Sequence, residues 1–168
     1  MLSIFFLYKK EINKEEHNLE NPILSKPKDQ RCQFYLGHEK GVEFFCYPVY
    51  FTDVMHDALA ACVSYLETGA SAIRLDCSGA EYTVILTGEI IYMLDDTELP
   101  QIHILDFGDF TPKRFCENIL ECYKEGPENW IDLAGTGLPE ENIEQCERAT
   151  RKNFDEMSVK IIKLLELL

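Results

Sequence analysis

The stretch AIRLDCSGAEYTVILTGEIIYMLDDTELPQIHILDF, residues Ala72–Phe107, holds the densest β-type apolar content in the chain. Its alternation with turn residues predicts four strands, at Ala72–Asp76, Tyr82–Leu86, Glu89–Leu94 and Ile102–Phe107. The last two carry apolar residues on both faces, a pattern typical of strands that lie centrally in a sheet and are covered by helices. We therefore expect this stretch to form the buried centre of the fold.

The segments before this stretch predict further strands and one helix. A hairpin of Cys32–Leu36 and Val42–Tyr47 is expected, because its loop has glycine at both ends. A helix beginning at Thr52 or Asp53 and reaching about Glu67 is indicated by an N-cap residue and by Gly69 just after its end. Ile4–Tyr8 is predicted as a first strand, and residues 9–30 as a long polar loop or a short exposed helix.

Two helices are predicted after the stretch. Thr111-Pro112 begins the first and Gly126-Pro127 ends it. Asn129–Leu133 is interpreted as a short strand or turn, and Pro139 opens a long helix that reaches the C-terminus. The prediction is a single α+β domain over residues 1–168. It has a mostly antiparallel or mixed sheet of about five to seven strands packed by three helices.

The charge distribution narrows the class of partner. The formal net charge is −14, and residues 51–147 contain twenty acidic but only four basic side chains. From Leu75 to Pro112 there is no Lys or Arg. Because nucleic-acid binding depends on basic side chains, and anionic membranes repel acidic ones, neither partner is expected. The negative electrostatic field of such a chain attracts cations, basic peptides or basic proteins. The alternative interpretation is that the acidic residues only keep the protein soluble.

The seven cysteines do not form a recognisable disulfide or zinc pattern. They are odd in number, evenly spread and contain no CxxC pair. A reducing cytoplasm is the natural setting for such thiols. The apolar N-terminus lacks a basic region before it and is too short for a signal peptide, and no apolar run reaches the length of a membrane span. We expect a cytoplasmic protein.

Each candidate catalytic residue in the sequence also has a structural interpretation. Carboxylates near strand ends could hold a divalent ion or act in hydrolysis. The DDTE stretch lacks the DxDxDG pattern of a calcium loop, and solvated turn residues are the favoured interpretation. Cys77, with His56 or His103 as a base, could be a nucleophile. Its neighbour Asp76 disfavours the thiolate, so a structural cysteine is the default. No cofactor or metal is predicted.

With no catalytic constellation, binding is favoured over catalysis. A small, acidic, cytoplasmic α+β protein resembles the bacterial immunity proteins that neutralise contact-dependent growth-inhibition or polymorphic toxins. The resemblance rests on size, acidity and the lack of catalytic motifs. No sequence motif is shared, so no functional residue of that class can be assigned to this chain. It implies a tight complex with a basic, nuclease-type toxin domain, in which complementary charge speeds association.

The expected partner-binding surface combines acidic residues near strand ends with two tyrosines of the type enriched at interface hot spots. These residues are Asp95, Asp96, Glu98, Asp106, Asp109, Tyr47 and Tyr50. Two alternatives remain open. One is a small metal-dependent hydrolase that uses the strand-end carboxylates. The other is an adaptor protein that forms a homodimer through its C-terminal helix, whereas the binding protein could be a monomer.

Overall fold

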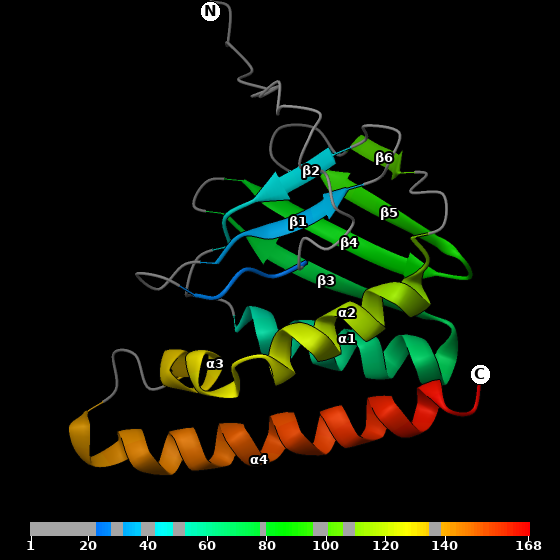
Figure 1. The fold of residues 1–168 in the computed structure, drawn as a ribbon. Helices are drawn as coiled ribbons and strands as arrows, with labels where there is room; N and C mark the ends of the chain where they lie inside the picture. Colours follow the sequence, from blue (N-terminus) through cyan, green and yellow to red (C-terminus); the bar gives the residue numbers. More distant parts are fainter. Residues whose placement is uncertain are drawn as a thin grey trace, which may run out of the picture.

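A computed structural model describes residues 23–27, 32–37, 43–48, 53–77, 80–95, 101–105, 110–134 and 139–168. The expected strand at residues 4–8 and most of the expected polar loop lie outside these ranges. The described elements follow one another in an α+β order (Figure 1). They are β1 (Phe34–Gly37), β2 (Glu43–Cys46), α1 (Val54–Thr68), β3 (Ala70–Asp76), β4 (Glu81–Thr87), β5 (Ile90–Asp95), β6 (Gln101–Leu105), α2 (Pro112–Lys124), α3 (Pro127–Ala134) and α4 (Glu140–Leu165).

The strands of the described ranges form two separate antiparallel sheets. β3, β4, β5 and β6 pair in chain order as a four-stranded meander, and β1 pairs with β2 as a two-stranded hairpin. The single sheet of about five to seven strands was therefore a wrong expectation. The hairpin does not extend the meander edge to edge. It packs against one face of it instead (Figure 1).

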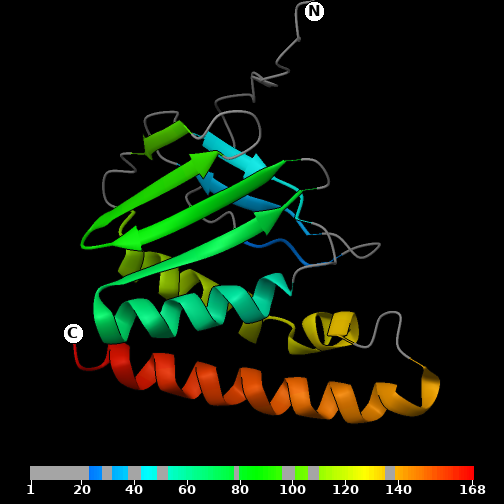
Figure 2. The ribbon, with the colours of Figure 1, turned by 180° about the vertical axis from the view of Figure 1, so that it is seen from behind.

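The four-stranded sheet has one packed face and one outward face. Alternate residues on β3, β4 and β5 are buried, as the strand period of two requires: Ile73, Leu75, Val84, Leu86, Ile91 and Met93. All of these side chains except Met93 share a hydrophobic core with residues of the hairpin and of α1, α2 and α4. The hairpin lies in front of the sheet in Figure 1 and behind it in Figure 2, so the second view looks onto the outward face.

The expectation that the last two strands lie centrally was wrong for β6, which is an edge strand. The expectation of burial on both faces was wrong for β5, which is buried only at alternate positions. The prediction that β5 lies at the centre of the sheet rested on its apolar residues on both faces. In an antiparallel meander, however, one face can pack on the core while the other faces out. The apolar side chains of β5 that face outward are therefore not explained by the core of the fold. They belong to the surface described in the next subsection.

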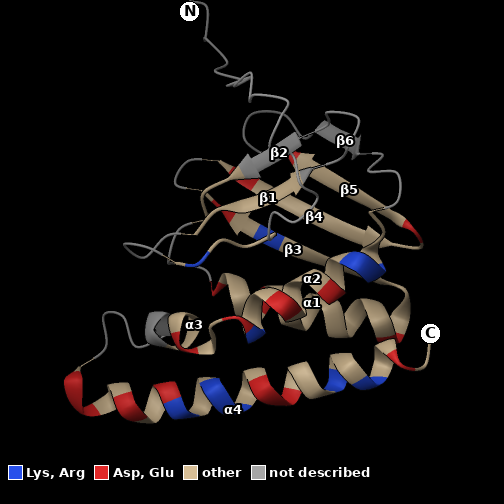
Figure 3. Ribbon diagram, viewed as in Figure 1, with Lys and Arg blue, Asp and Glu red and all other residues tan. Residues whose placement is uncertain are grey.

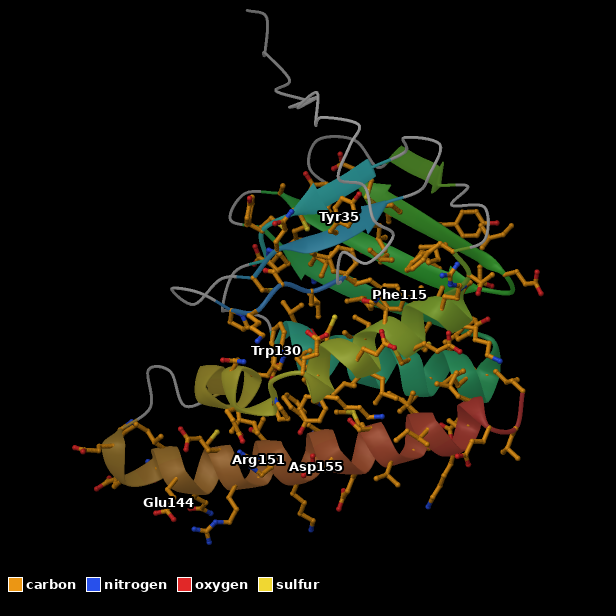
Figure 4. All side chains as sticks on the ribbon, viewed as in Figure 1. Tyr35, Phe115, Trp130, Glu144, Arg151 and Asp155 are labelled. Atoms are coloured by element: carbon orange, nitrogen blue, oxygen red, sulfur yellow. The ribbon has the colours of Figure 1, made fainter. Side chains whose placement is uncertain are left out.

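Local end signals place the first two helices correctly. The Asp53 carboxylate accepts a hydrogen bond of 3.0 Å from the His56 amide and caps α1. Gly69 ends α1 in the left-handed region at φ 81°, where glycine has no steric penalty. α2 begins with Thr111 as its cap and Pro112 in its first turn, as expected. Phe115 of α2 lies in the core, with its ring centre 6.4 Å from that of Phe34 (Figure 4).

Residues 127–134 form the helix α3 rather than the short strand or turn that was expected. Trp130 is 3% exposed, and its indole nitrogen donates to the Cys122 carbonyl oxygen at 3.3 Å. A tertiary contact to α2 thus stabilises a helix of eight residues, which is too short to be stable alone. The described residues consequently form four helices, where three were expected.

The long C-terminal helix is confirmed as α4. It runs along the outer side of α1, α2 and α3, with Phe154, Ser158 and Ile161 buried in the contact (Figure 1). Tyr123 of α2 donates a hydrogen bond of 2.8 Å to Asp155, and Arg151 pairs with Glu128 of α3. Figure 4 shows Arg151 and Asp155 in adjacent turns of α4. Within the described residues, no helix is long and apolar enough to cross a membrane.

Candidate functional site: the outward face of the four-stranded sheet

The outward face carries apolar side chains at its centre. Pairing places Ala72 of β3 opposite Ile85 of β4, and Ile85 opposite Tyr92 of β5. Because side chains alternate between faces, these three residues form one row across the side of the sheet that is turned away from the core. Ala72 is exposed, and Ile85 and Tyr92 are half-buried.

Two further apolar residues extend this row along β5. Ile90 is 44% exposed and Leu94 is half-buried. We call Ala72, Ile85, Ile90, Tyr92 and Leu94 the outward apolar patch. Among the described parts of the chain, no helix or strand lies over it (Figure 2). Grouped apolar exposure of this kind marks interaction surfaces, whereas single exposed apolar residues do not.

Carboxylates lie at the end of the sheet beside this patch. Asp76 at the end of β3 is the register partner of Glu81 at the start of β4, and Asp95 ends β5. We call these three residues the acidic margin. The view coloured by charge shows acidic residues at these strand ends and a basic segment on β3 (Figure 3). That segment contains Arg74, whose guanidinium pairs with the Glu81 carboxylate.

Asp95 affects a tyrosine on the neighbouring strand. Tyr82 is its register partner, and the pKa of Tyr82 is raised, first by burial and then by the negative charge of Asp95. The sulfurs of Cys77 and Cys46 add smaller contributions in the same direction. The acidic margin is therefore continuous with a group of half-buried side chains between the sheet and the hairpin.

Two of the seven residues expected at the partner surface lie in the described ranges. Tyr47 follows β2 and is 53% exposed, and its backbone N–H donates to the Cys77 sulfur. Since Cys77 also lies near Tyr82, the partner of Asp95, Tyr47 and Asp95 belong to the same end of the sheet. Neither is part of the outward apolar patch. The remaining five residues lie outside the described ranges: Asp96, Glu98, Asp106, Asp109 and Tyr50.

The sequence interpretation missed the outward apolar patch itself. Its signal was present in the apolar residues on both faces of β5, but that pattern was interpreted as two-sided burial. In the four-stranded meander, one apolar face of β5 packs on the core and the other is turned outward. The patch residues of β5, which are Ile90, Tyr92 and Leu94, were therefore predicted to be buried, while the polar strand ends were predicted as the site.

The arrangement supports contact with a macromolecule more directly than chemistry. Within the described residues there is no group of three or more His, Cys, Asp or Glu side chains positioned to bind a metal ion. Exposed apolar centres bordered by charged residues are the usual composition of protein–protein interfaces. Searches of protein-family models, curated proteins and solved structures found no match to this chain.

Proposed function

We propose that the protein is an acidic binding protein that neutralises a basic, nuclease-type toxin domain by forming a tight complex. The outward apolar patch is the centre of its binding surface, and the acidic margin is part of the rim. The observation that carries this proposal is the row Ala72–Ile85–Tyr92, which is apolar, accessible and placed on the side of the sheet opposite the core.

The apolar centre accounts for affinity. Aromatic side chains such as Tyr92 and aliphatic ones such as Ile85 supply most of the binding energy when a partner covers them. The sheet backbone holds both residues in fixed positions, so little conformational freedom is lost on binding. Binding of a partner would explain why this face of the sheet carries apolar residues outside the core.

The charges account for partner choice and speed of association. The chain carries a net charge of −14, and its sequence has no Lys or Arg from Leu75 to Pro112. A basic domain is attracted to this surface, whereas an acidic one is repelled. A nuclease-type toxin fits this requirement because it must itself carry positive charge to bind phosphates.

Capture from the native lysate tests the proposal. Tagged protein on a resin is washed at low and then moderate salt, and retained proteins are identified. We expect one basic protein in stoichiometric amount, retained by the wild type and by Val159→Asp, a matched control at an exposed apolar position on α4. Tyr92→Asp should lose it.

Neutralisation is measured on the captured protein. Its own activity, assayed on nucleic acid with increasing amounts of the purified chain, should fall to background at a one-to-one ratio. Full activity at saturation would contradict neutralisation even if the two proteins bind. Failure of every basic protein to remain bound, together with a rise in melting temperature on adding Mg²⁺ or Mn²⁺, would favour the metal-dependent hydrolase instead.

A further inference from the structure

The last turn of α1 and the turn between β4 and β5 are joined by a closed cycle of three hydrogen bonds. The Gly69 N–H donates to the Tyr65 carbonyl oxygen at 2.7 Å, and the Gly88 N–H donates to the Gly69 carbonyl oxygen at 3.2 Å. The Tyr65 hydroxyl donates to the Gly88 carbonyl oxygen at 2.6 Å and so closes the cycle. We call Tyr65, Gly69 and Gly88 the hydrogen-bonded cycle.

The backbone conformation of two glycines makes the cycle possible. Gly69 has a φ of 81° and Gly88 a φ of 53°, in the left-handed region that residues with a Cβ atom rarely adopt. Thr87 and Ile90 are register partners, so Gly88 and Glu89 form a two-residue turn. The backbone groups of Gly88 therefore lie beyond the ladder of β4 and β5, and both bond to the end of α1 instead.

The hydrogen-bonded cycle lies at one end of the outward apolar patch. Ala70 follows Gly69, and it forms one row with Thr87 and Ile90 across the outward face. Ile90 is 44% exposed and is the patch residue next to the turn. Two opposite views show the α1–β3 connection and the β4–β5 turn at the same end of the sheet (Figure 1, Figure 2). The acidic margin lies at the opposite strand ends, so the cycle holds the end of the patch that is remote from it.

The hydroxyl of Tyr65 is the part of the cycle that a substitution can remove. The Tyr65 ring is half-buried and packs against the hydrophobic core, which fixes the position of the hydroxyl. Linked hydrogen bonds polarise and strengthen one another, so loss of the hydroxyl should also weaken the bond between Gly88 and Gly69. Turns at the end of a sheet open locally at little cost in free energy, and a partner that needs the closed turn then binds more weakly.

We propose that Tyr65 is a positioning residue of the outward apolar patch. Through the hydrogen-bonded cycle it holds the β4–β5 turn, and with it Ile90, in the conformation that the basic partner binds. This inference rests on the proposed function and adds a residue that acts through Ile90. The binding surface is then held in place by α1, which packs against β3, as well as by the strand ladder. Such preorganisation raises affinity because less ordering is needed on binding.

A matched pair of tyrosine-to-phenylalanine variants tests this role. Tyr65→Phe removes the hydroxyl and keeps the ring against the core. Tyr123→Phe is the control, because the Tyr123 hydroxyl donates a hydrogen bond of 2.8 Å to Asp155 between α2 and α4, on the core side of the sheet. Each variant loses one tyrosine hydrogen bond, and both should lower the melting temperature by roughly 2–4 °C.

Hydrogen exchange of the Gly88 amide, followed by NMR, reports on the turn without any partner. In Tyr65→Phe this exchange should be at least about tenfold faster than in the wild type, whereas Tyr123→Phe should leave it unchanged. Affinity is then measured by calorimetry with the basic protein captured from the lysate. Tyr65→Phe should weaken its binding by about 5- to 10-fold, and Tyr123→Phe by less than about twofold.

Substitutions of Gly88 provide a second approach. A Cβ added there meets no atom within 4 Å, so the backbone conformation decides whether a side chain is tolerated. Asparagine tolerates the left-handed region, so Gly88→Asn should keep the cycle and the affinity. Valine does not, so Gly88→Val should open the turn and weaken binding as Tyr65→Phe does. Adding Tyr65→Phe to Gly88→Val should cause little further loss, because both changes break the same cycle.

The outcomes separate this inference from the proposed function. Unchanged exchange of the Gly88 amide in Tyr65→Phe would show that the hydroxyl does not hold the turn. Faster exchange with unchanged affinity, or equal losses of affinity for Tyr65→Phe and Tyr123→Phe, would show that the turn is not positioned for binding. Each of these results would overturn the inference while the basic partner still binds. If the wild type retains no basic partner, the proposed function fails and the inference fails with it.

Discussion

Ile85 of β4 and Tyr92 of β5 stand directly opposite each other on the outward face of the four-stranded sheet. The neighbouring pair Leu86 and Ile91 is turned to the core, with exposures of 0% and 1%. Residues one position apart on the same strands therefore serve different purposes, since one pair holds the fold together and the other is accessible to a partner.

Replacing adjacent residues of β4 should separate stability from binding. Leu86→Ala removes a fully buried side chain and should lower the free energy of unfolding by about 2–5 kcal/mol. Ile85→Ala, on the outward face, should cost less than about 1 kcal/mol. Urea denaturation followed through the single tryptophan, Trp130, measures both. Equal losses would mean that the outward face is covered.

The pairing of Arg74 with Glu81 gives a prediction about association kinetics. Arg74→Gln removes the positive charge beside the acidic margin and should increase the association rate of a basic partner by roughly twofold at low salt. Glu81→Gln should decrease it by a similar factor. Stopped-flow measurements at two salt concentrations check this, because screening should shrink both effects. A change of the opposite sign for Arg74→Gln would place the partner elsewhere.

Phe154 should be the residue of α4 on which its attachment depends most. Its side chain is fully buried and meets the Tyr123 ring edge to face, with ring centres 5.6 Å apart. Phe154→Ala should lower the free energy of unfolding by about 3–5 kcal/mol. Val159→Ala, at an exposed position on the same helix, should change it by less than about 0.5 kcal/mol. Thermal and urea unfolding provide the comparison.

Stability should fall in alkali because buried thiols resist ionisation. Burial, aided by Cys77, raises the pKa of Cys32 from 9.0 to about 12. Below pH 9 this thiol is protonated in both states, so it contributes no pH dependence. Between pH 9 and 12 only the unfolded chain loses the proton, so the free energy of unfolding decreases as pH rises.

The Cys32 contribution can be isolated by substitution. For Cys32→Ala the loss of stability between pH 9 and pH 10.5 should be smaller than for the wild type, by up to about 1.4 kcal/mol per pH unit. Unfolding is measured in urea under a reducing agent so that disulfides do not interfere. Identical slopes for the two proteins would show that Cys32 is solvated in the folded state.

Local signals in the sequence predicted much of the fold. Asp53 and Gly69 delimited α1, Thr111 and Pro112 began α2, and the glycines at both ends of the loop predicted that β1 and β2 pair as a hairpin. Each of these effects operates over a few residues and can be recognised without tertiary structure. The secondary structure of residues 127–134 could not be predicted from such signals, because this helix depends on the burial of Trp130 against α2.

The candidate site was harder to predict than the elements that carry it. The apolar content of β5 was recognised, but whether both faces are covered depends on sheet order and on where the hairpin packs. Neither is encoded within the strand.

The central claim is that the outward apolar patch binds a basic partner, and a titration of the captured partner tests it most directly. Its dissociation constant is measured by calorimetry against the wild type, the double variant Ile85→Asp/Tyr92→Asp and the control Val159→Asp. Replacing Ile85 and Tyr92 by carboxylates should weaken binding by at least about 100-fold, whereas Val159→Asp should leave the affinity unchanged. Equal affinity for all three proteins, with the double variant still folded, would contradict the account.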